Sequence, residues 1–373
     1  MLPRRIAKHA RVKHRAAVKK FVETCIPDDL LRQSQVSVRI ARNKDMQLIK
    51  AFLLLSSTAI SLTVSLTINT PNVIYNTTGP LENLAIRPNG NVLITRFDVP
   101  QLWEIDPSSG STVLVHDFQS QTTNTILGIT EYEKDIYVVG GGTLNQTSFL
   151  GKPGTWAVWR VDLRAKNSPA KVDLITTIQE AILLNGLAVL PPPTMRRDER
   201  SSKSKSILVA DSASGVVYTV SPSQKSYKVF YSDPDTMSPA PNAFPLIGVN
   251  GVRFFTDRAR TSYLYYSVTS VSRFYRVRLD KNNVVEGVPE LLLSPTYALD
   301  DFALTNHGTA YIASNTGNVF VKRDSDGSVT VIGGNGTNRT VFAGATSVRL
   351  GKIRGRDMAY VTTFAGRLLA ITL

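Results

Sequence analysis

Four polar side chains occupy the same place in a phrase that recurs along the chain. Glu82, Asn185, Asn250 and Asp300 each stand second in a short, mostly apolar segment. Two carboxylates and two amide oxygens are hard ligands, of the kind that Ca²⁺ and Mg²⁺ take in proteins while water completes the shell. If the fold brings the four side chains together, the sequence predicts a polar site that can hold such an ion.

The fold that would bring them together repeats six times. The four residues stand in four of six matching segments. These are LENLAI (81–86), ILGIT (126–130), LNGLAV (184–189), VNGVRF (249–254), LDDFAL (299–304) and ATSVRL (345–350). A second phrase follows each of them, aligned on Trp103, Trp159, Tyr218, Tyr275, Phe320 and Leu369 at steps of 45 to 59 residues. This spacing is typical of a four-stranded propeller blade. The sequence therefore predicts an all-β, six-bladed β-propeller whose inner strands line one axial channel.

Closure of the ring is predicted from its two ends. The sixth repeat stops at Leu373, directly after its third strand, and so has no outer strand of its own. The segment Asn72–Asn76 precedes the first inner strand and can pair there, which removes the exposed edges of an open ring. We expect a propeller over residues 66–373, closed by this N-terminal strand.

The first 65 residues show no propeller pattern. Residues 1–45 hold twelve Lys or Arg and four Asp or Glu, a net +8 of the chain's formal +14, and are interpreted as a basic leader or an extension of the gene model. Because the charge lies outside the repeats, we expect no nucleic-acid partner. Residues 46–65 contain an apolar run of signal-peptide length, too short for a stable membrane span.

Two further observations favour the secretory pathway. The only cysteine is Cys25, in the leader, so the expected propeller contains no disulfide. Four glycosylation sequons stand in polar or Gly-rich settings, at Asn76, Asn145, Asn335 and Asn338. We therefore expect a secreted protein or one that enters the secretory pathway.

Other catalytic arrangements are absent from the sequence. Two of the four histidines, His9 and His14, lie in the leader, while His116 ends an outer strand and His307 stands in a turn-like segment. A histidine-based triad or metal cluster is not apparent. The chain also lacks a Gly-x-Ser-x-Gly elbow, a P-loop and a dinucleotide-binding fingerprint.

The inner strands resemble those of the senescence-marker-protein-30 and gluconolactonase-like propellers. That family has Glu, Asn, Asn and Asp in this order in the same repeats, and an LVADS-like second strand as at 208–212. The resemblance implies that Glu82, Asn185, Asn250 and Asp300 hold a divalent metal and that Asp300 is a base in opening sugar lactones. This chain departs from the family where Asp301 stands in place of the usual Gly.

A closer resemblance is to fungal hetero-Diels-Alderases of tropolonic sesquiterpenoid biosynthesis. It is carried by GPLENLAIRPNGNVLITRF (79–97), LLNGLAV, GVNGVRF and ALDDFAL. Those enzymes join a tropolone-derived o-quinone methide to a humulene-type terpene and form a dihydropyran ring. A cycloaddition needs no nucleophile and no cofactor, only two partners held in a reactive geometry with the heterodiene oxygen polarised.

This resemblance implies a set of site residues at one mouth of the channel. The catalytic candidates are Glu82, Asp300, Asp301 and Arg96, of which Arg96 would polarise an oxygen of the tropolone. Phe97 and Phe364 would pack against the terpene. The other substrate-binding candidates are Asn185, Asn250, Asp211, Ser267 and Asn315.

Three interpretations remain open. The first is an enzyme that catalyses the [4+2] cycloaddition of two small molecules. The second is a metal-dependent lactonase or related hydrolase that uses Glu82, Asn185, Asn250 and Asp300 as ligands for Ca²⁺ or Mg²⁺. The third is a secreted propeller that binds a partner without catalysis, which would have no need for carboxylates and amides at one channel mouth.

Overall fold

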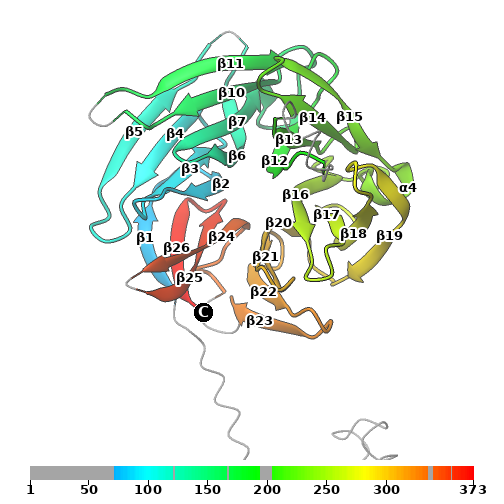
Figure 1. Ribbon diagram of the computed structural model, residues 1–373. Coiled ribbons are helices and arrows are strands. Elements are labelled where there is room, and N and C mark those ends of the chain that lie inside the picture. Colours follow the sequence, from blue (N-terminus) through cyan, green and yellow to red (C-terminus); the bar gives the residue numbers. More distant parts are fainter. Residues whose placement is uncertain (1–70, 121, 166–167, 194–203, 335–338, 354) are drawn as a thin grey trace, which may run out of the picture. The chain divides into compact units, whose positions relative to one another are not determined.

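Six four-stranded antiparallel sheets form a ring around a central axis in the computed structural model (Figure 1). The structure describes residues 71–120, 122–165, 168–193, 204–334, 339–353 and 355–373. The predicted leader, the signal-like segment, Cys25 and the sequons at Asn335 and Asn338 lie outside these residues. The predicted all-β, six-bladed propeller is confirmed.

Each blade runs from an inner to an outer strand in sequence order. Blade 1 comprises β2 (Leu81–Ile86), β3 (Val92–Arg96), β4 (Gln101–Ile105) and β5 (Thr112–Asp117). Blade 2 comprises β6 (Thr125–Glu133), β7 (Ile136–Gly142), β10 (Ala157–Asp162) and β11 (Lys171–Thr177). Blade 3 comprises β12 (Leu184–Leu190), β13 (Ser206–Asp211), β14 (Val216–Ser221) and β15 (Ser226–Ser232).

Blades 4 and 5 follow the same order. Blade 4 comprises β16 (Val249–Thr256), β17 (Ser262–Val268), β18 (Arg273–Leu279) and β19 (Val285–Leu293). Blade 5 comprises β20 (Leu299–Leu304), β21 (Ala310–Ser314), β22 (Val319–Arg323) and β23 (Val329–Gly333). A small hairpin, β8 (Leu144–Asn145) with β9 (Leu150–Gly151), extends the β7–β10 connection, and a short helix, α4 (Pro234–Met237), precedes blade 4.

Blade 6 joins the two ends of the propeller. Its strands β24 (Ala345–Ile353), β25 (Arg356–Thr363) and β26 (Arg367–Thr372) are completed by β1 (Asn72–Asn76). β1 pairs with β26 from Asn72 opposite Ala370 to Asn76 opposite Arg367. The predicted closure by the N-terminal strand is thus confirmed, and it removes two unpaired sheet edges.

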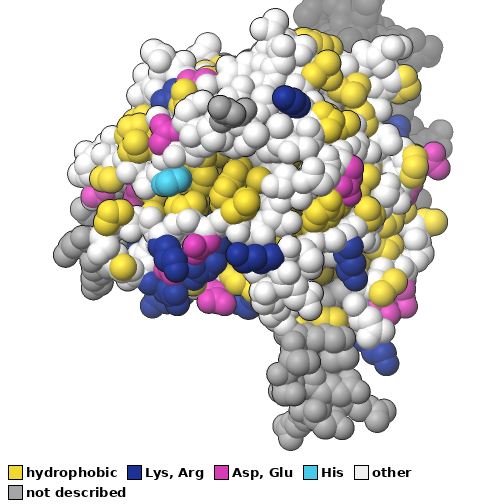
Figure 2. Space-filling model, turned by 90° about the horizontal axis from the view of Figure 1, so that it is seen from above, with side chains coloured by type: hydrophobic (Ala, Val, Ile, Leu, Met, Phe, Trp, Pro, Cys, Tyr) yellow, Lys and Arg dark blue, Asp and Glu magenta, His cyan; other side chains and the backbone are white. Residues whose placement is uncertain are grey.

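Apolar side chains between neighbouring blades form the core. Tyr218, Tyr275 and Phe320 of the recurring phrase are buried there, while Trp103 and Trp159 are half-buried. The outer edge seen in Figure 2 has a hollow in which apolar side chains gather. A cavity of about 420 Å³ lies between β5 and β11, lined by residues that include His116, Phe118 and Trp159.

Glycines allow the inner strands to approach closely. A Cβ atom on Gly128 would lie 2.0 Å from the carbonyl oxygen of Asn185, and one on Gly186 would lie 2.3 Å from that of Asn250. No side chain fits at such distances. The third place of these inner strands therefore has to be glycine for the polar second-place residues to come together at the axis.

Among the described residues, no helix is long and apolar enough to cross a membrane. Asn76 and Asn145, two of the predicted glycosylation sites, are exposed. Their modification stays a prediction.

We predict that closure by β1 sets the stability of the ring. Deleting residues 72–76 removes the ladder partner of β26 and the packing of Ile74 and Tyr75 against Leu368. Losing contacts of this kind is expected to lower the free energy of unfolding by about 4 kcal/mol. That corresponds to a fall in the thermal midpoint on the order of 10 °C, measurable by calorimetry. The control is a chain that begins at residue 71 and keeps residues 72–76. Equal thermal midpoints for this chain and for the one without residues 72–76 would contradict the prediction.

Candidate functional site

The site lies where the inner strands begin. Leu81 pairs with Arg96, Leu184 with Asp211 and Leu299 with Ser314, so the start of each of these inner strands meets the end of the second strand. We call this end of the channel the mouth. The side chains named for the site belong to the inner-strand starts and the second-strand ends, so the fold gathers them at one end of the axis.

The four second-place residues are buried at the mouth. None of Glu82, Asn185, Asn250 and Asp300 exposes more than 7% of its surface. The amide nitrogen of Asn250 donates to Asp300 Oδ1 at 2.7 Å. The amide nitrogen of Asn83 donates to Glu82 Oε2 at 3.2 Å and to Asn185 Oδ1 at 3.3 Å. The four therefore form two hydrogen-bonded halves.

Electrostatics join the two halves. Burial raises the pKa of Asp300 to about 8, with a further contribution from the negative charge of Asp301. Burial also raises the pKa of Glu82 well above its usual range, and the charges of Asp300 and Asp301 add to this. Near neutral pH the Asp300 carboxyl therefore carries a proton that it can donate.

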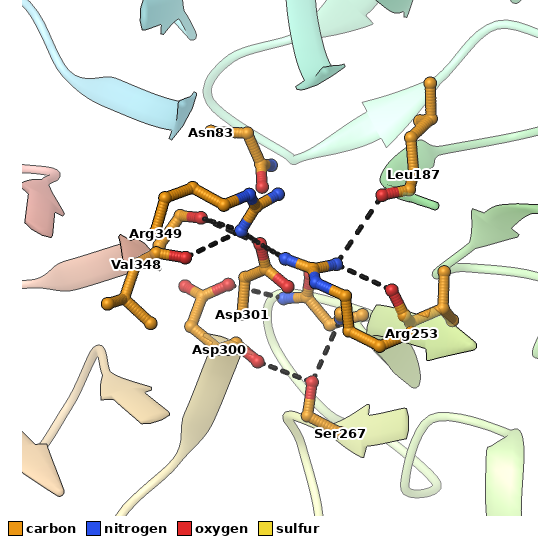
Figure 3. A network of polar contacts seen from close by, with 12 residues as sticks. Asn83, Leu187, Arg253, Ser267, Asp300, Asp301, Val348 and Arg349 are labelled. Carbon is orange, nitrogen blue, oxygen red and sulfur yellow. Dashed lines mark hydrogen bonds and ion pairs between the residues drawn. The ribbon is translucent and has the colours of Figure 1, made fainter. Parts of the chain in front are cut away.

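Asp301 has the opposite character (Figure 3). Its Oδ2 atom accepts from Arg253 at 2.6 Å, from Arg349 at 2.8 Å and from the Ser347 hydroxyl at 2.7 Å. Burial alone would raise the pKa of Asp301, but the two guanidinium groups outweigh it and hold the pKa below its usual range. The two adjacent carboxyls thus differ: the surroundings of Asp301 favour its ionised form, and those of Asp300 favour its protonated form.

Arg253 and Arg349 were not predicted from the sequence. Burial, together with the charge of Arg349, lowers the pKa of Arg253 to about 10, because one carboxylate faces two cations. A signal was present: both arginines stand fifth in their inner strands, VNGVRF and ATSVRL. Since side chains alternate along a strand, the third and fifth places share a face, so both point to the axis as Asp301 does.

Two residues at the second-strand ends support Asp300 directly. The Asn315 amide donates to Asp300 Oδ2 at 3.3 Å. Ser267 donates its hydroxyl to the backbone oxygen of Asp300 and accepts from the amide of Gly251 at 2.9 Å. The structure therefore brings Asn315 and Ser267 to Asp300, and their contact with a substrate stays a prediction.

Two other candidates have partners of their own. The Arg96 guanidinium forms an ion pair with Asp98, with Nε 2.9 Å from Oδ1. The Asp211 carboxylate accepts from the backbone amides of Ile182 at 3.0 Å and Leu183 at 2.9 Å, and so fixes the loop that enters β12. Neither residue hydrogen-bonds to the four second-place side chains, and substrate contact by either stays a prediction.

One side of the mouth is apolar. Phe97 follows β3 and Phe364 follows β25, and their ring centroids are 5.3 Å apart. Leu127, the second-place residue of blade 2, belongs to the same apolar cluster. The amide of Phe97 donates to the carbonyl of Pro80 at 3.1 Å, two residues before Glu82. The aromatic side chains therefore begin beside the polar ones.

The donor set is compatible with a divalent cation. Asn250 Oδ1 is buried and has no hydrogen-bond partner among the described residues, so it can coordinate a cation. Within the same residues, no three His, Cys, Asp or Glu side chains are grouped so that they could hold a metal. A cation would therefore depend on Asn185 and Asn250 besides Glu82 and Asp300, and would supply positive charge to a substrate oxygen.

Comparison with known proteins gives relatives at modest similarity. No family model matches the chain. A protein described as "Putative hetero-Diels-Alderase", from Phoma sp, is 24% identical over 310 residues, which cover 78% of this chain and 84% of that protein. The resemblance predicted from the sequence is thus supported by a curated relative.

Solved structures share the fold. The calcium-binding protein regucalcin from Agrobacterium tumefaciens superimposes with a TM-score of 0.54 at 12% identity, over 81% of this chain and 93% of that one. An auxiliary nutrient binding protein from Bacteroides thetaiotaomicron gives 0.53 at 12% identity, over 79% and 69%. Similarity at these identities shows a shared fold alone.

We predict that Asp301 is structurally indispensable. Asp301→Asn removes the buried charge that pairs with the half-buried guanidinium groups of Arg253 and Arg349, at a cost of about 3–5 kcal/mol in the free energy of unfolding. The matched control is Asp357→Asn, because the Lys352 to Asp357 pair is exposed on the surface. Its loss is expected to cost less than about 1 kcal/mol. Denaturant unfolding measures both; equal losses would contradict the importance of the ion cluster.

We also predict a pH dependence that arises from Asp300 and Glu82. The folded protein keeps protons on these carboxyls that the unfolded chain releases above about pH 4. Between about pH 4 and pH 8 the free energy of unfolding is therefore highest at the acidic end. It falls as the pH rises toward about 8, the pKa of Asp300 in the folded protein. In buffer containing a chelator, Asp300→Asn should flatten the decline in thermal midpoint between pH 5.5 and 8. Parallel declines in both proteins would refute the raised pKa.

Proposed function

We propose that this protein catalyses a hetero-Diels-Alder cycloaddition between a tropolone o-quinone methide and a humulene-type sesquiterpene. The observation that carries the proposal is the buried carboxyl of Asp300, whose pKa is raised by burial, at a channel mouth that also has an aromatic surface. Similarity to the protein described as "Putative hetero-Diels-Alderase" supports the reaction class. The polar half of the mouth suits the oxygenated partner, and the apolar half suits the hydrocarbon.

Asp300 would polarise the heterodiene. A protonated carboxyl donates a hydrogen bond to the quinone methide oxygen and draws electron density from the diene, which makes it more reactive toward an electron-rich alkene. An ionised carboxylate could not donate this bond. Asn250 and Asn315 hold the two oxygens of Asp300, so the direction of the donated hydrogen bond is fixed by neighbours.

The same carboxyl can generate the heterodiene from a hydroxymethyl precursor. Asp300 gives its proton to the hydroxyl that leaves as water, and the ring hydroxyl returns a proton to the carboxylate. The carbon–oxygen bond breaks, the ring becomes a quinone methide, and the acid is regenerated. Glu82, whose pKa is likewise raised by burial and neighbouring charge, can take either role in this exchange.

Orientation accounts for the remaining rate enhancement. Holding two partners in a reactive geometry replaces a bimolecular encounter by an internal step. Phe97, Phe364 and Leu127 would hold the terpene on the apolar side of the mouth. These apolar side chains then determine which face of the alkene meets the heterodiene, and the product forms with one configuration.

A metal-dependent lactonase is the second candidate. It is favoured by the unpartnered Asn250 Oδ1 and by the two carboxyls whose protons a cation would displace. In that case Glu82, Asn185, Asn250 and Asp300 hold the ion and a sugar lactone is the substrate. The two candidates differ in metal requirement and in product.

The Asp300→Asn variant distinguishes the effect of the shape of this side chain from the effect of its acidic proton. The amide keeps the size of the side chain and loses the acidic proton, so the rate of cycloaddition should fall on the order of 10²-fold. Asp357→Asn, on the exposed surface, should leave the rate unchanged. Product from a hydroxymethyl tropolone and a humulene-type alcohol is measured by chiral chromatography, with chelator present.

The outcomes distinguish the candidates. A single stereoisomer that depends on the protein and on Asp300 supports the cycloaddition. The same product mixture with and without protein refutes it. Hydrolysis of a sugar lactone that requires Ca²⁺ and is lost in Asp300→Asn would establish the lactonase instead.

A further inference from the structure

Four phenylalanine rings form a continuous row at the mouth. Phe364 and Phe97 are 5.3 Å apart, Phe97 and Phe149 are 5.4 Å apart, and Phe149 and Phe244 are 5.9 Å apart, between ring centroids. We call these four residues the aromatic ladder. Phe149 lies in the β8–β9 hairpin and Phe244 in the segment between α4 and β16.

The ladder follows the mouth around the ring. Phe364 belongs to blade 6, Phe97 to blade 1 and Phe149 to blade 2, while Phe244 precedes the first strand of blade 4. Each residue follows a second strand or precedes an inner strand, so all lie at the end where Glu82 and Asp300 are found. No single blade could provide such a surface.

Exposure increases outward from Phe97 along the ladder. Phe97 is 6% exposed, Phe364 and Phe149 are half-buried, and Phe244 is 71% exposed. Among the described residues, no other phenylalanine, tyrosine or tryptophan falls in the exposed class. A ring that served only the core would be covered, whereas this row leaves an apolar surface for a ligand.

The backbone that presents Phe149 is strained. Phe149 has a φ of 56°, in the left-handed region that a bulky side chain rarely adopts. Its amide donates to the carbonyl of Asn145 at 2.8 Å, and the Asn145 side chain accepts from the amides of Thr147 and Ser148, both at 3.0 Å. The hairpin therefore holds the ring between Phe97 and Phe244, and such strain is often retained at ligand-binding positions.

We infer that the aromatic ladder is the subsite for the apolar reaction partner and that Phe244 determines which hydrocarbon skeletons are accepted. The inference rests on the proposed cycloaddition and assigns its two partners to separate surfaces. Aromatic faces and edges bind alkenes and alkyl groups by dispersion and exclusion of water. They offer no hydrogen bond to the oxygens of a tropolone, which instead meet the carboxyl of Asp300.

Phe244 is the residue whose replacement leaves the rest of the site intact. Its ring contacts Phe149 alone among the described aromatic residues, and it is absent from the buried cluster that contains Phe97. Phe244→Ala therefore removes ligand surface with little effect on packing. The matched control is Val288→Ala on β19, where an 86% exposed apolar side chain is shortened in the same way.

Binding is tested with humulene, a hydrocarbon without oxygen, by saturation-transfer NMR and by titration. The wild-type protein and Val288→Ala should bind it equally, and Phe244→Ala should bind about tenfold more weakly. Phe149→Gly, which removes the ring and relieves the strained backbone, should weaken binding at least as much while the protein stays folded. Equal binding by the wild type and Phe244→Ala overturns the inference, as does failure of the wild type to bind humulene.

Turnover separates this inference from the proposed function. In Phe244→Ala the KM for the terpene should rise about tenfold and the KM for the tropolone should stay unchanged, because the two partners lie on separate surfaces. If the wild type binds humulene through Phe244 but forms no cycloadduct, the subsite stands and the proposed reaction fails. If cycloadduct forms and its terpene KM is the same in Phe244→Ala, the reaction stands and the subsite assignment fails.

Discussion

The ionised carboxylate of Asp301 is the interaction on which the rest of the site depends. It lies on the axis and binds Arg253 of blade 4 and Arg349 of blade 6, so that three inner strands are tied at one atom. Burial is the larger cause of the raised pKa of the adjacent Asp300, and the charge of Asp301 adds to it, because a second negative charge in a buried place is unfavourable. One buried charge thus ties three inner strands together and favours the protonated form of the neighbouring Asp300 at the mouth.

The division of the mouth into polar and apolar surfaces follows from the same repeat. Blades 1, 3, 4 and 5 place Glu82, Asn185, Asn250 and Asp300 second in their inner strands, whereas blade 2 has Leu127 there. The aromatic ladder extends this apolar side with rings from blades 6, 1 and 2 and from the segment before blade 4. A reaction between one oxygenated and one hydrocarbon partner suits such a division better than the hydrolysis of a polyhydroxy lactone, which would gain little from four phenylalanine rings.

The repeat made the blades, their order and the closing strand predictable from the sequence, because each strand recurs with the same alternation and only one outer strand is missing. The convergence of Glu82 with Asp300 was predictable for the same reason. Arg253 and Arg349 could have been found from their shared fifth place, which strand alternation puts on the axial face. Phe149 and Phe244 could not, since they lie in connections of irregular length where no repeat fixes the position of a side chain. The opposite protonation of Asp300 and Asp301 also could not, because it depends on which carboxyl the arginines reach.

We predict that Asp300 carries a proton at neutral pH while Asp301 does not. The most direct measurement is a pH titration of the aspartate side-chain carboxyl signals by ¹³C NMR in metal-free protein, with Asp300 assigned by its absence from Asp300→Asn. We predict that the Asp300 signal titrates with a pKa near 8. Titration near 4, the usual value for an aspartate, would contradict the account.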